Sequence, residues 1–165
     1  MKIIRLKLLF EGGIFIKVVS YSPKYKEIFV QMNLKWIAEM FVVEDEDEKI
    51  LNNVDDLIAK GGEIFFTLDD DEKVLACCML EPHENGDWEI AKFASTGKVK
   101  GAGSLCLQAC MKFAKQKGIE KLLIVSNKKC EAAIHLYRKF DFTEIPVDKE
   151  KFPFERADIA FEKYL

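Results

Sequence analysis

The sequence has no uninterrupted apolar run close to the roughly 20 residues that a membrane-spanning helix needs. It also lacks an excess of positive charge, because 25 Lys and Arg residues are outnumbered by 28 Asp and Glu residues, for a net charge of -3. This balance argues against a nucleic-acid binder held by overall electrostatic attraction. We therefore expect neither a membrane nor a nucleic acid among the partners of this chain.

Cysteine pairs with the spacing of a metal site are also missing, and histidine is scarce. None of the five cysteines belongs to a Cys-x-x-Cys motif, and only His83 and His135 could add imidazole ligands. We therefore predict no metal site. An odd number of cysteines without such spacing is typical of reduced thiols in a cytoplasmic protein. The first residues are too interrupted by charge for a signal peptide, which agrees with a cytoplasmic location.

Linkers, repeats and low-complexity segments that would divide the chain are absent as well. With 165 residues, 49% of them hydrophobic, the sequence suits a single domain, which we place at residues 14–165. Residues 1–13 have two interpretations. Ile4, Leu6 and Leu8 alternate with charged residues and could form an extra strand, or the segment could be an N-terminal extension.

The pattern of apolar residues and turn signals predicts an α+β fold with a mixed sheet. Ser22-Pro23 is typical of a helix start, and that helix should run to about Phe41. An antiparallel meander then leads through a helix into a further strand and a closing hairpin. The expected strands are 63–68, 74–80, 88–95, 122–125, 142–145 and 156–162, and the other expected helices are 44–60, 104–117 and 130–140.

The segment from Lys98 to Ser104 places a basic Gly-x-Gly turn directly before the amphipathic helix predicted for 104–117. A helix N-terminus has unpaired N–H groups and a partial positive charge, and Gly101 and Gly103 would let those groups approach an anion. Lys98 and Lys100 add full charges. These residues predict a phosphate site, although a glycine-rich turn with solvated lysines fits the segment equally well on its own.

The element order resembles that of the GNAT superfamily of acetyl-CoA-dependent N-acyltransferases when it is combined with two motifs. They are Lys98-x-x-Gly101-x-Gly103 and Ala133-Ile134-x-Leu136-Tyr137-x-x-Phe140-x-Phe142. The resemblance covers nearly all of residues 14–165, and the stretches 32–37 and 89–95 are similar to small bacterial members. It implies the GNAT fold, a mixed, mostly antiparallel sheet of six to seven strands with about four helices, and acetyl-CoA as cofactor.

The resemblance also implies which residues contact coenzyme A. The turn would bind the pyrophosphate through backbone amides, the strand at 88–95 would bind the pantetheine arm, and Asn127 would reach the cofactor from its loop. Lys98 stands where the family commonly has Gln or Arg, so we expect the amides to contribute more than this side chain. A register with Lys100 in that role is the alternative. The predicted cofactor-binding residues are Phe93, Ala94, Ser95, Lys98, Val99, Lys100, Gly101, Ala102, Gly103, Ser104 and Asn127.

Tyr137 occupies the position of the tyrosine that the family commonly places near the coenzyme sulfur, which makes it the candidate general acid. Its alternative is an aromatic side chain packed with Leu136 and Phe140. Glu89 is the candidate base for the substrate amine, and it could equally be a salt-bridge partner or an anchor for an ammonium group. Cys130 could be a nucleophile, but direct attack is usual in the family, so we interpret it as a residue at a helix start.

The resemblance implies an N-acetyltransferase that transfers an acetyl group from acetyl-CoA to a primary amine of a small molecule or peptide by direct attack. The alternative is a non-catalytic acyl-CoA-binding or regulatory module, and a homodimer is possible. The acceptor side would be formed by Trp36, Met40, Phe41 and the segment 152–157.

The acceptor itself is left open by the charged residues. We interpret the acidic run 44–48 as a solvated face, with attraction of a cationic substrate as the alternative. Arg156 and Lys92 could instead anchor a carboxylate. Asp141 replaces a usual glycine, where we expect a left-handed backbone.

Overall fold

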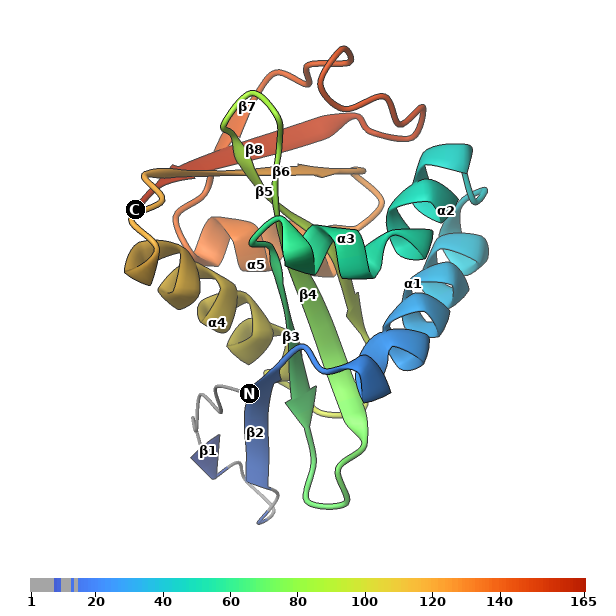
Figure 1. The fold of residues 1–165 in the computed structure, drawn as a ribbon, viewed down its shortest axis with the longest axis vertical. Coiled ribbons are helices and arrows are strands. Elements are labelled where there is room, and N and C mark those ends of the chain that lie inside the picture. Colours follow the sequence, from blue (N-terminus) through green and yellow to red (C-terminus); the bar gives the residue numbers. More distant parts are fainter. Residues whose placement is uncertain (1–7, 10–12, 14) are drawn as a thin grey trace.

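The computed structural model describes residues 8–9, 13 and 15–165. A mixed sheet runs through the molecule in the order β1-β2-β3-β4-β5-β6-β8-β7 (Figure 1). The strands are β1 (Leu8–Leu9), β2 (Phe15–Ser20), β3 (Glu63–Leu68), β4 (Val74–Pro82), β5 (Trp88–Ser95), β6 (Lys121–Ser126), β7 (Thr143–Ile145) and β8 (Ile159–Tyr164). The helices are η1 (Pro23–Tyr25), α1 (Lys26–Met40), α2 (Asp45–Asn52), α3 (Val54–Ala59), α4 (Ala102–Gln116) and α5 (Glu131–Lys139).

The predicted α+β fold with a mixed, mostly antiparallel sheet is confirmed. Strands β5 and β6 pair in parallel, and the other pairs are antiparallel. The two-residue β1 pairs with β2 and adds an edge strand to the seven strands β2–β8. The rest of the predicted extra strand, residues 1–7 and 10–12, lies outside the described residues. No helix of the described residues is long and apolar enough to cross a membrane.

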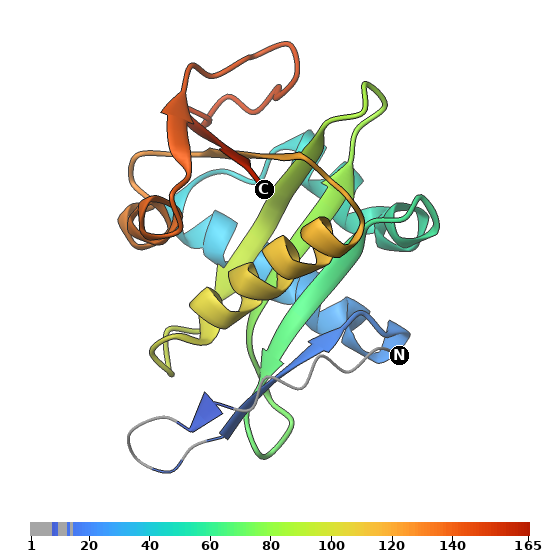
Figure 2. The same ribbon diagram turned by 90° about the vertical axis from the view of Figure 1, so that its left-hand side faces the viewer.

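Two hydrophobic cores lie on opposite faces of the sheet, because successive side chains of a strand point to opposite sides. On β3, Phe65 packs in the core beneath α4, while Ile64, Phe66 and Leu68 pack in the core beneath α1, α2 and α3. Figure 2 shows α4 crossing the near face of the central strands, with α1 behind them. The four cysteines of these cores, Cys77, Cys78, Cys106 and Cys110, are free thiols, as predicted.

Several predicted boundaries differ from the structure, and three of these differences bear on the site. The helix expected for 44–60 is interrupted at Asn53 into α2 and α3. Helix α4 begins at Ala102 rather than Ser104, because Gly101, with φ of 90°, already turns the chain into the helix. The last strand begins at Ile159 rather than Arg156, because Arg156 is held in the preceding loop by bonds to Glu44 and Asp47.

The site is positioned by an irregularity of β5. Its parallel pairing with β6 is restricted to Glu89 and Leu123, so the two strands separate beyond that point. Its register with β4 also shifts between Cys77 and Met79, which is the pattern of a β-bulge. Lys92 lies in this bulge with φ of 48°, a left-handed conformation that costs a residue with a side chain about 1–3 kcal/mol. The separation opens a gap in the sheet, and the bulge redirects Lys92.

Candidate active site

A cavity of about 1020 Å³ occupies the gap between β5 and β6. Its wall runs from the start of α4, along β5, to α5 and the loop before β8. Most of the predicted site residues lie on this wall: Trp36, Met40, Phe41, Glu89, Phe93, Ala94, Ser95, Val99, Lys100, Gly101, Gly103, Ser104, Asn127 and Tyr137. Lys98 and Ala102 do not. Lys98 is exposed outside the cavity, and Ala102 is 1% exposed in the core under α4.

The start of α4 presents backbone donors to the cavity. Gly101 is the left-handed N-cap, Ala102 N–H donates to Val99 O (3.3 Å) and Leu105 N–H donates to Gly101 O (3.1 Å). The N–H groups of Gly103 and Ser104 are therefore the first-turn donors without a partner in the described part of the chain. Such donors at a helix N-terminus suit an anion. Of the two lysines considered for the basic position of the turn, Lys100 lines the cavity and Lys98 does not.

Gly103 packs closely against β5. A Cβ atom at this position would lie 3.0 Å from Cζ of Phe93, which is tighter than ordinary contact. The Phe93 ring in turn lies 6.4 Å from the ring of Tyr137, measured between centroids. The glycine therefore allows the helix start and the separated strand to approach one another, and it keeps Phe93 beside Tyr137.

Tyr137 lies on α5 and is 4% exposed. Its ring packs against Phe142 and Phe161, with centroid distances of 6.1 and 5.5 Å, while the residue also contributes to the cavity wall. Burial raises the pKa of its phenol well above 10. Tyr137 is thus both a packed aromatic residue and a protonated phenol at the cavity, so the two interpretations of this residue are compatible.

Glu89 belongs to a group of three side chains that the sequence prediction did not assemble. Its Oε2 lies 2.8 Å from Nε2 of His83, and β-sheet register places Glu81 directly opposite Glu89. Burial, with the charge of Glu89, raises the pKa of Glu81 to about 7, and the hydrogen bond to Glu89 raises that of His83.

The same three groups, Glu81, His83 and Glu89, bring their ligand atoms within 4.8 Å of one another. Ligand atoms of a tetrahedral zinc site lie closer, at about 3.5 Å from each other, as zinc–ligand bonds of 2.0–2.2 Å require. A direct hydrogen bond joins His83 and Glu89, and the strand register places Glu81 beside them.

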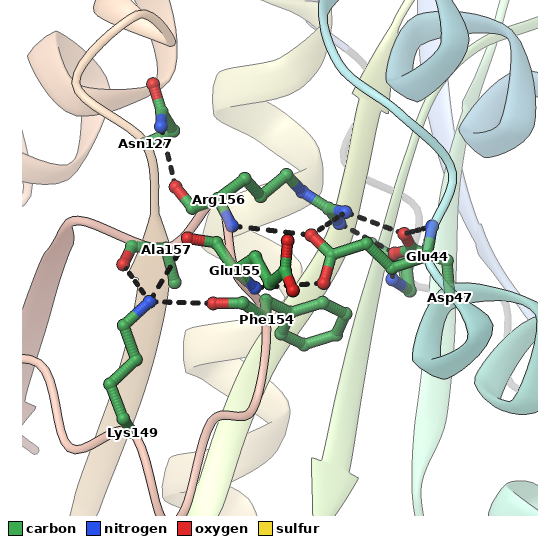
Figure 3. Close-up of polar contacts among 9 residues, drawn as sticks. Glu44, Asp47, Asn127, Lys149, Phe154, Glu155, Arg156 and Ala157 are labelled. Atoms are coloured by element: carbon green, nitrogen blue, oxygen red, sulfur yellow. Dashed lines mark hydrogen bonds and ion pairs between the residues drawn. The ribbon is translucent and has the colours of Figure 1, made fainter.

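A buried ion network fixes the acceptor side of the cavity. Asp47 is 0% exposed and accepts hydrogen bonds from Lys92 Nζ (2.6 Å) and from both Nη atoms of Arg156 (2.6 Å each). Glu44 binds Arg156 as well, at 3.2 Å (Figure 3). Burial alone would raise the pKa of Asp47, but the bonds from Arg156 and Lys92 lower it to about 2. The acidic run 44–48 is therefore not a solvated face at Glu44 and Asp47, which was the interpretation from sequence.

The loop between β7 and β8 is held at several points around Arg156. Lys149 Nζ donates to three carbonyl oxygens of this loop, those of Phe154, Glu155 and Ala157, and Glu44 accepts from the Glu155 N–H (Figure 3). Asn127 Nδ2 donates to Arg156 O at 2.6 Å, and Asn127 Oδ1 accepts from Lys129 N–H. Asn127 thus lies on the cavity wall with its amide engaged in holding the loop.

The acceptor side combines aromatic rings with the network. Trp36 packs edge-on against Phe41, with centroids 6.3 Å apart, and its indole N–H donates to Asn33 Oδ1. The Arg156 guanidinium lies over the rings of Phe41 (5.8 Å) and Phe154 (4.8 Å). Since Lys92 and Arg156 are both bound to Asp47, neither is a free cation for a substrate carboxylate.

Sequence reasoning missed one residue of the cavity wall, Glu81, and three residues that hold wall residues in place, Glu44, Asp47 and His83. A usable signal existed for Glu81, because a hairpin closed around 83–87 places it opposite Glu89. None existed for the bond between Asp47 and Arg156, which joins residues 109 positions apart in the chain.

Comparisons with known proteins agree with this fold. The sequence of residues 30–142 matches the Acetyltransferase (GNAT) family. A search of the curated proteins finds no match. An acetyltransferase of the GNAT family from Staphylococcus aureus is similar in structure, with a TM-score of 0.80 at 18% identity over 91% of this chain and 99% of that one.

Two further solved structures share the fold at similar identity. The PaiA N-acetyltransferase of Thermoplasma acidophilum, in complex with coenzyme A, has a TM-score of 0.69 at 16% identity and covers 91% of this chain and 99% of its own. A ribosomal-protein-alanine N-acetyltransferase of Brucella melitensis has a TM-score of 0.70 at 15% identity, covering 90% and 99%. The family match spans more than half of the chain and includes the glycine turn and Tyr137. The chain belongs to the acetyltransferase (GNAT) family.

Proposed function

We propose that this protein transfers an acetyl group from acetyl-CoA to a primary amine of a small molecule or peptide by direct attack of the amine. One observation carries the proposal: a single cavity joins an anion-binding helix start, the gap between two separating strands and a buried tyrosine. The relative from Thermoplasma acidophilum is in complex with coenzyme A, which supports the same cofactor here.

The residues present fit a coenzyme A molecule. The free N–H groups of Gly103 and Ser104, with Lys100 beside them, would hold the pyrophosphate. Beyond Glu89, the edge of β5 that faces β6 is unpaired, so the backbone of Phe93 to Ser95 is available to the amides of the pantetheine arm. When bound, acetyl-CoA supplies the activated acetyl thioester.

Side chains of the protein would donate and accept the protons of the reaction. The transfer forms a C–N bond and breaks a C–S bond, so the sulfur gains a proton and the nitrogen of an ammonium substrate loses two. Tyr137, kept protonated by burial, would donate the proton to the sulfur and be restored by one from the nitrogen. Glu89 would accept the other proton, either directly or through water.

The test measures release of free thiol from acetyl-CoA across a panel of amines, amino acids and peptides, together with the melting temperature of the protein. We expect acetyl-CoA to raise the melting temperature and at least one amine to release thiol. A melting temperature that does not respond to saturating acetyl-CoA would contradict the proposed cofactor. A thermal shift without amine-dependent thiol release would favour the non-catalytic acyl-CoA-binding module.

A further inference from the structure

Two glutamates face each other across neighbouring strands at the acceptor side of the cavity. Glu81 of β4 pairs in register with Glu89 of β5, and both contribute to the cavity wall. Glu89 is 4% exposed. Like charges directly opposite each other destabilise an antiparallel pair, and burial increases that cost. Such a pair favours states in which it retains a proton or binds a cation.

His83 connects this pair to solvent. Its Nε2 lies 2.8 Å from Glu89 Oε2, its side chain is 31% exposed, and it is not among the described residues that line the cavity. The ring of Phe152 packs edge-on against the imidazole, with centroids 5.9 Å apart, which holds it in place. Glu89 therefore reaches the cavity on one side and, through His83, the solvent on the other.

The positive charges nearest the pair are already neutralised. Lys92, on β5 itself, and Arg156, on the loop before β8, both bond to Asp47. Glu44 also bonds to Arg156, so the two carboxylates of Asp47 and Glu44 balance these two cations.

The other charged groups around the pair do not supply a free cation to the cavity. From α2, Glu46 adds negative charge near Glu81. In the hairpin, Asp87 faces His83 and is bonded to Lys151 at 2.9 Å. Of the charged groups described here, the carboxyl pair is therefore the one that is offset by direct contact with His83 alone.

We propose that Glu81 and Glu89 act together to bind the acceptor as an ammonium ion and to accept its proton, which His83, as a positioning residue, passes on to solvent. This inference rests on the proposed function and names its substrate class: amines that are cationic at neutral pH.

The protonation chemistry agrees with this geometry. Because its pKa is raised to about 7, Glu81 exchanges a proton near neutral pH, where a general base works best. In the step, an N–H bond of the ammonium breaks, an O–H bond forms on the carboxyl pair, and the nitrogen keeps its electron pair for attack. The proton then moves from the pair to the imidazole of His83 and from there to water, which restores the pair.

The first test observes the pair without turnover. Glutamate side-chain carboxyls are labelled with ¹³C and followed by NMR across neutral pH in the wild type, Glu81→Gln and Glu84→Gln. Glu84 is the matched control because it is an exposed residue of the same hairpin. We expect one carboxyl to titrate near pH 7, to disappear in Glu81→Gln and to remain in Glu84→Gln. Adding 1,4-diaminobutane with coenzyme A should lower that midpoint in the wild type.

The second test measures kcat/KM against pH with the best amine found. Glu81→Gln should reduce kcat/KM at neutral pH by about tenfold or more and move the acidic limb to lower pH. His83→Asn should move that limb to higher pH, because the imidazolium no longer favours the ionised carboxylates. Glu84→Gln should behave like the wild type in both respects.

The two tests separate failure of this inference from failure of the proposed function. If the wild type acetylates an amine but no carboxyl titrates above about pH 6 and Glu81→Gln keeps the wild-type pH profile, the inference is overturned and the acetyltransferase stands. If no amine is acetylated, yet 1,4-diaminobutane lowers a midpoint that depends on Glu81, the ammonium site stands and the proposed catalysis fails.

Discussion

Asp47 is completely buried and bonded to two cations, Lys92 and Arg156. Removing one partner of a buried ion network leaves uncompensated charge, which typically costs about 3–5 kcal/mol. We therefore expect Asp47→Asn to lower the free energy of unfolding by about that amount, measured by urea denaturation. Asp55→Asn is the control, because the pair of Asp55 with Lys26 is exposed and should contribute less than about 1 kcal/mol. Equal losses in the two variants would contradict a special role for the network.

Tyr137 allows a prediction that separates catalysis from packing. In Tyr137→Phe the ring contacts with Phe142 and Phe161 persist, but the phenol proton is lost. We expect kcat to fall about a hundredfold or more, which is the usual contribution of a general acid, while the thermal shift caused by acetyl-CoA is retained. Tyr25→Phe, at a buried tyrosine in the other core, should leave kcat unchanged. A normal kcat in Tyr137→Phe would assign this residue to packing alone.

At the level of single residues, the sequence predicts backbone conformations that depend on near neighbours, but it does not predict partners that lie far along the chain. The left-handed backbone expected at Asp141 is confirmed, with φ of 61°, because it depends on helix-ending geometry close by. The interpretation of Asp47 as solvated is wrong because its environment is created by Arg156, far along the chain. Glu81 was overlooked although hairpin register alone would have placed it beside Glu89.

A substitution at the start of α4 tests both backbone strain and anion binding. Gly101 has φ of 90°, so Gly101→Ala introduces strain that should lower the free energy of unfolding by about 1–2 kcal/mol. The displaced N–H groups should also weaken coenzyme A binding by about tenfold, equivalent to one impaired charged hydrogen bond. Calorimetric titration measures the second effect.

Gly86 provides the matched control for that experiment. It has φ of 88° and open space around its Cα, but it lies in the hairpin between β4 and β5 rather than at the start of α4. Gly86→Ala should therefore cause a similar loss of stability with unchanged affinity for coenzyme A. If both variants bound coenzyme A normally, the helix start would not be the anion site.

Elements were predictable where their boundaries are set locally. The strands at 63–68 and 88–95 have the predicted limits because turn residues end them on both sides. The last strand begins later than predicted because the apolar pattern says nothing about the ion pairs that hold Arg156 in the loop. The bulge at Lys92 was likewise missed, since its left-handed backbone is stabilised by a buried partner on α2.

For the whole molecule, two shifted carboxyl pKa values predict how stability depends on pH. The pKa of Asp47 is lowered to about 2, so its stabilisation is present above its ordinary value of 3.8 and is lost as the pH falls towards 2. The pKa of Glu81 is raised to about 7 from 4.5, so folding favours its protonated form. That contribution is complete below 4.5 and is lost as the pH rises through 7.

Melting temperatures of the wild type, Asp47→Asn and Glu81→Gln, measured from about pH 2 to above pH 7, test the predicted direction of both effects on stability. From these two groups, the wild type should be most stable at about pH 4, above the ordinary pKa of Asp47 and below that of Glu81, and its stability should fall on either side. Its advantage over Asp47→Asn should shrink towards pH 2, where Asp47 no longer holds a negative charge between Lys92 and Arg156. Glu81→Gln cannot lose a proton, so its stability relative to the wild type should increase as the pH rises through 7. A constant difference between wild type and Glu81→Gln over that interval would mean that Glu81 is already ionised at neutral pH. The carboxyl pair would then hold its two charges across the sheet without the proton that its burial and register predict.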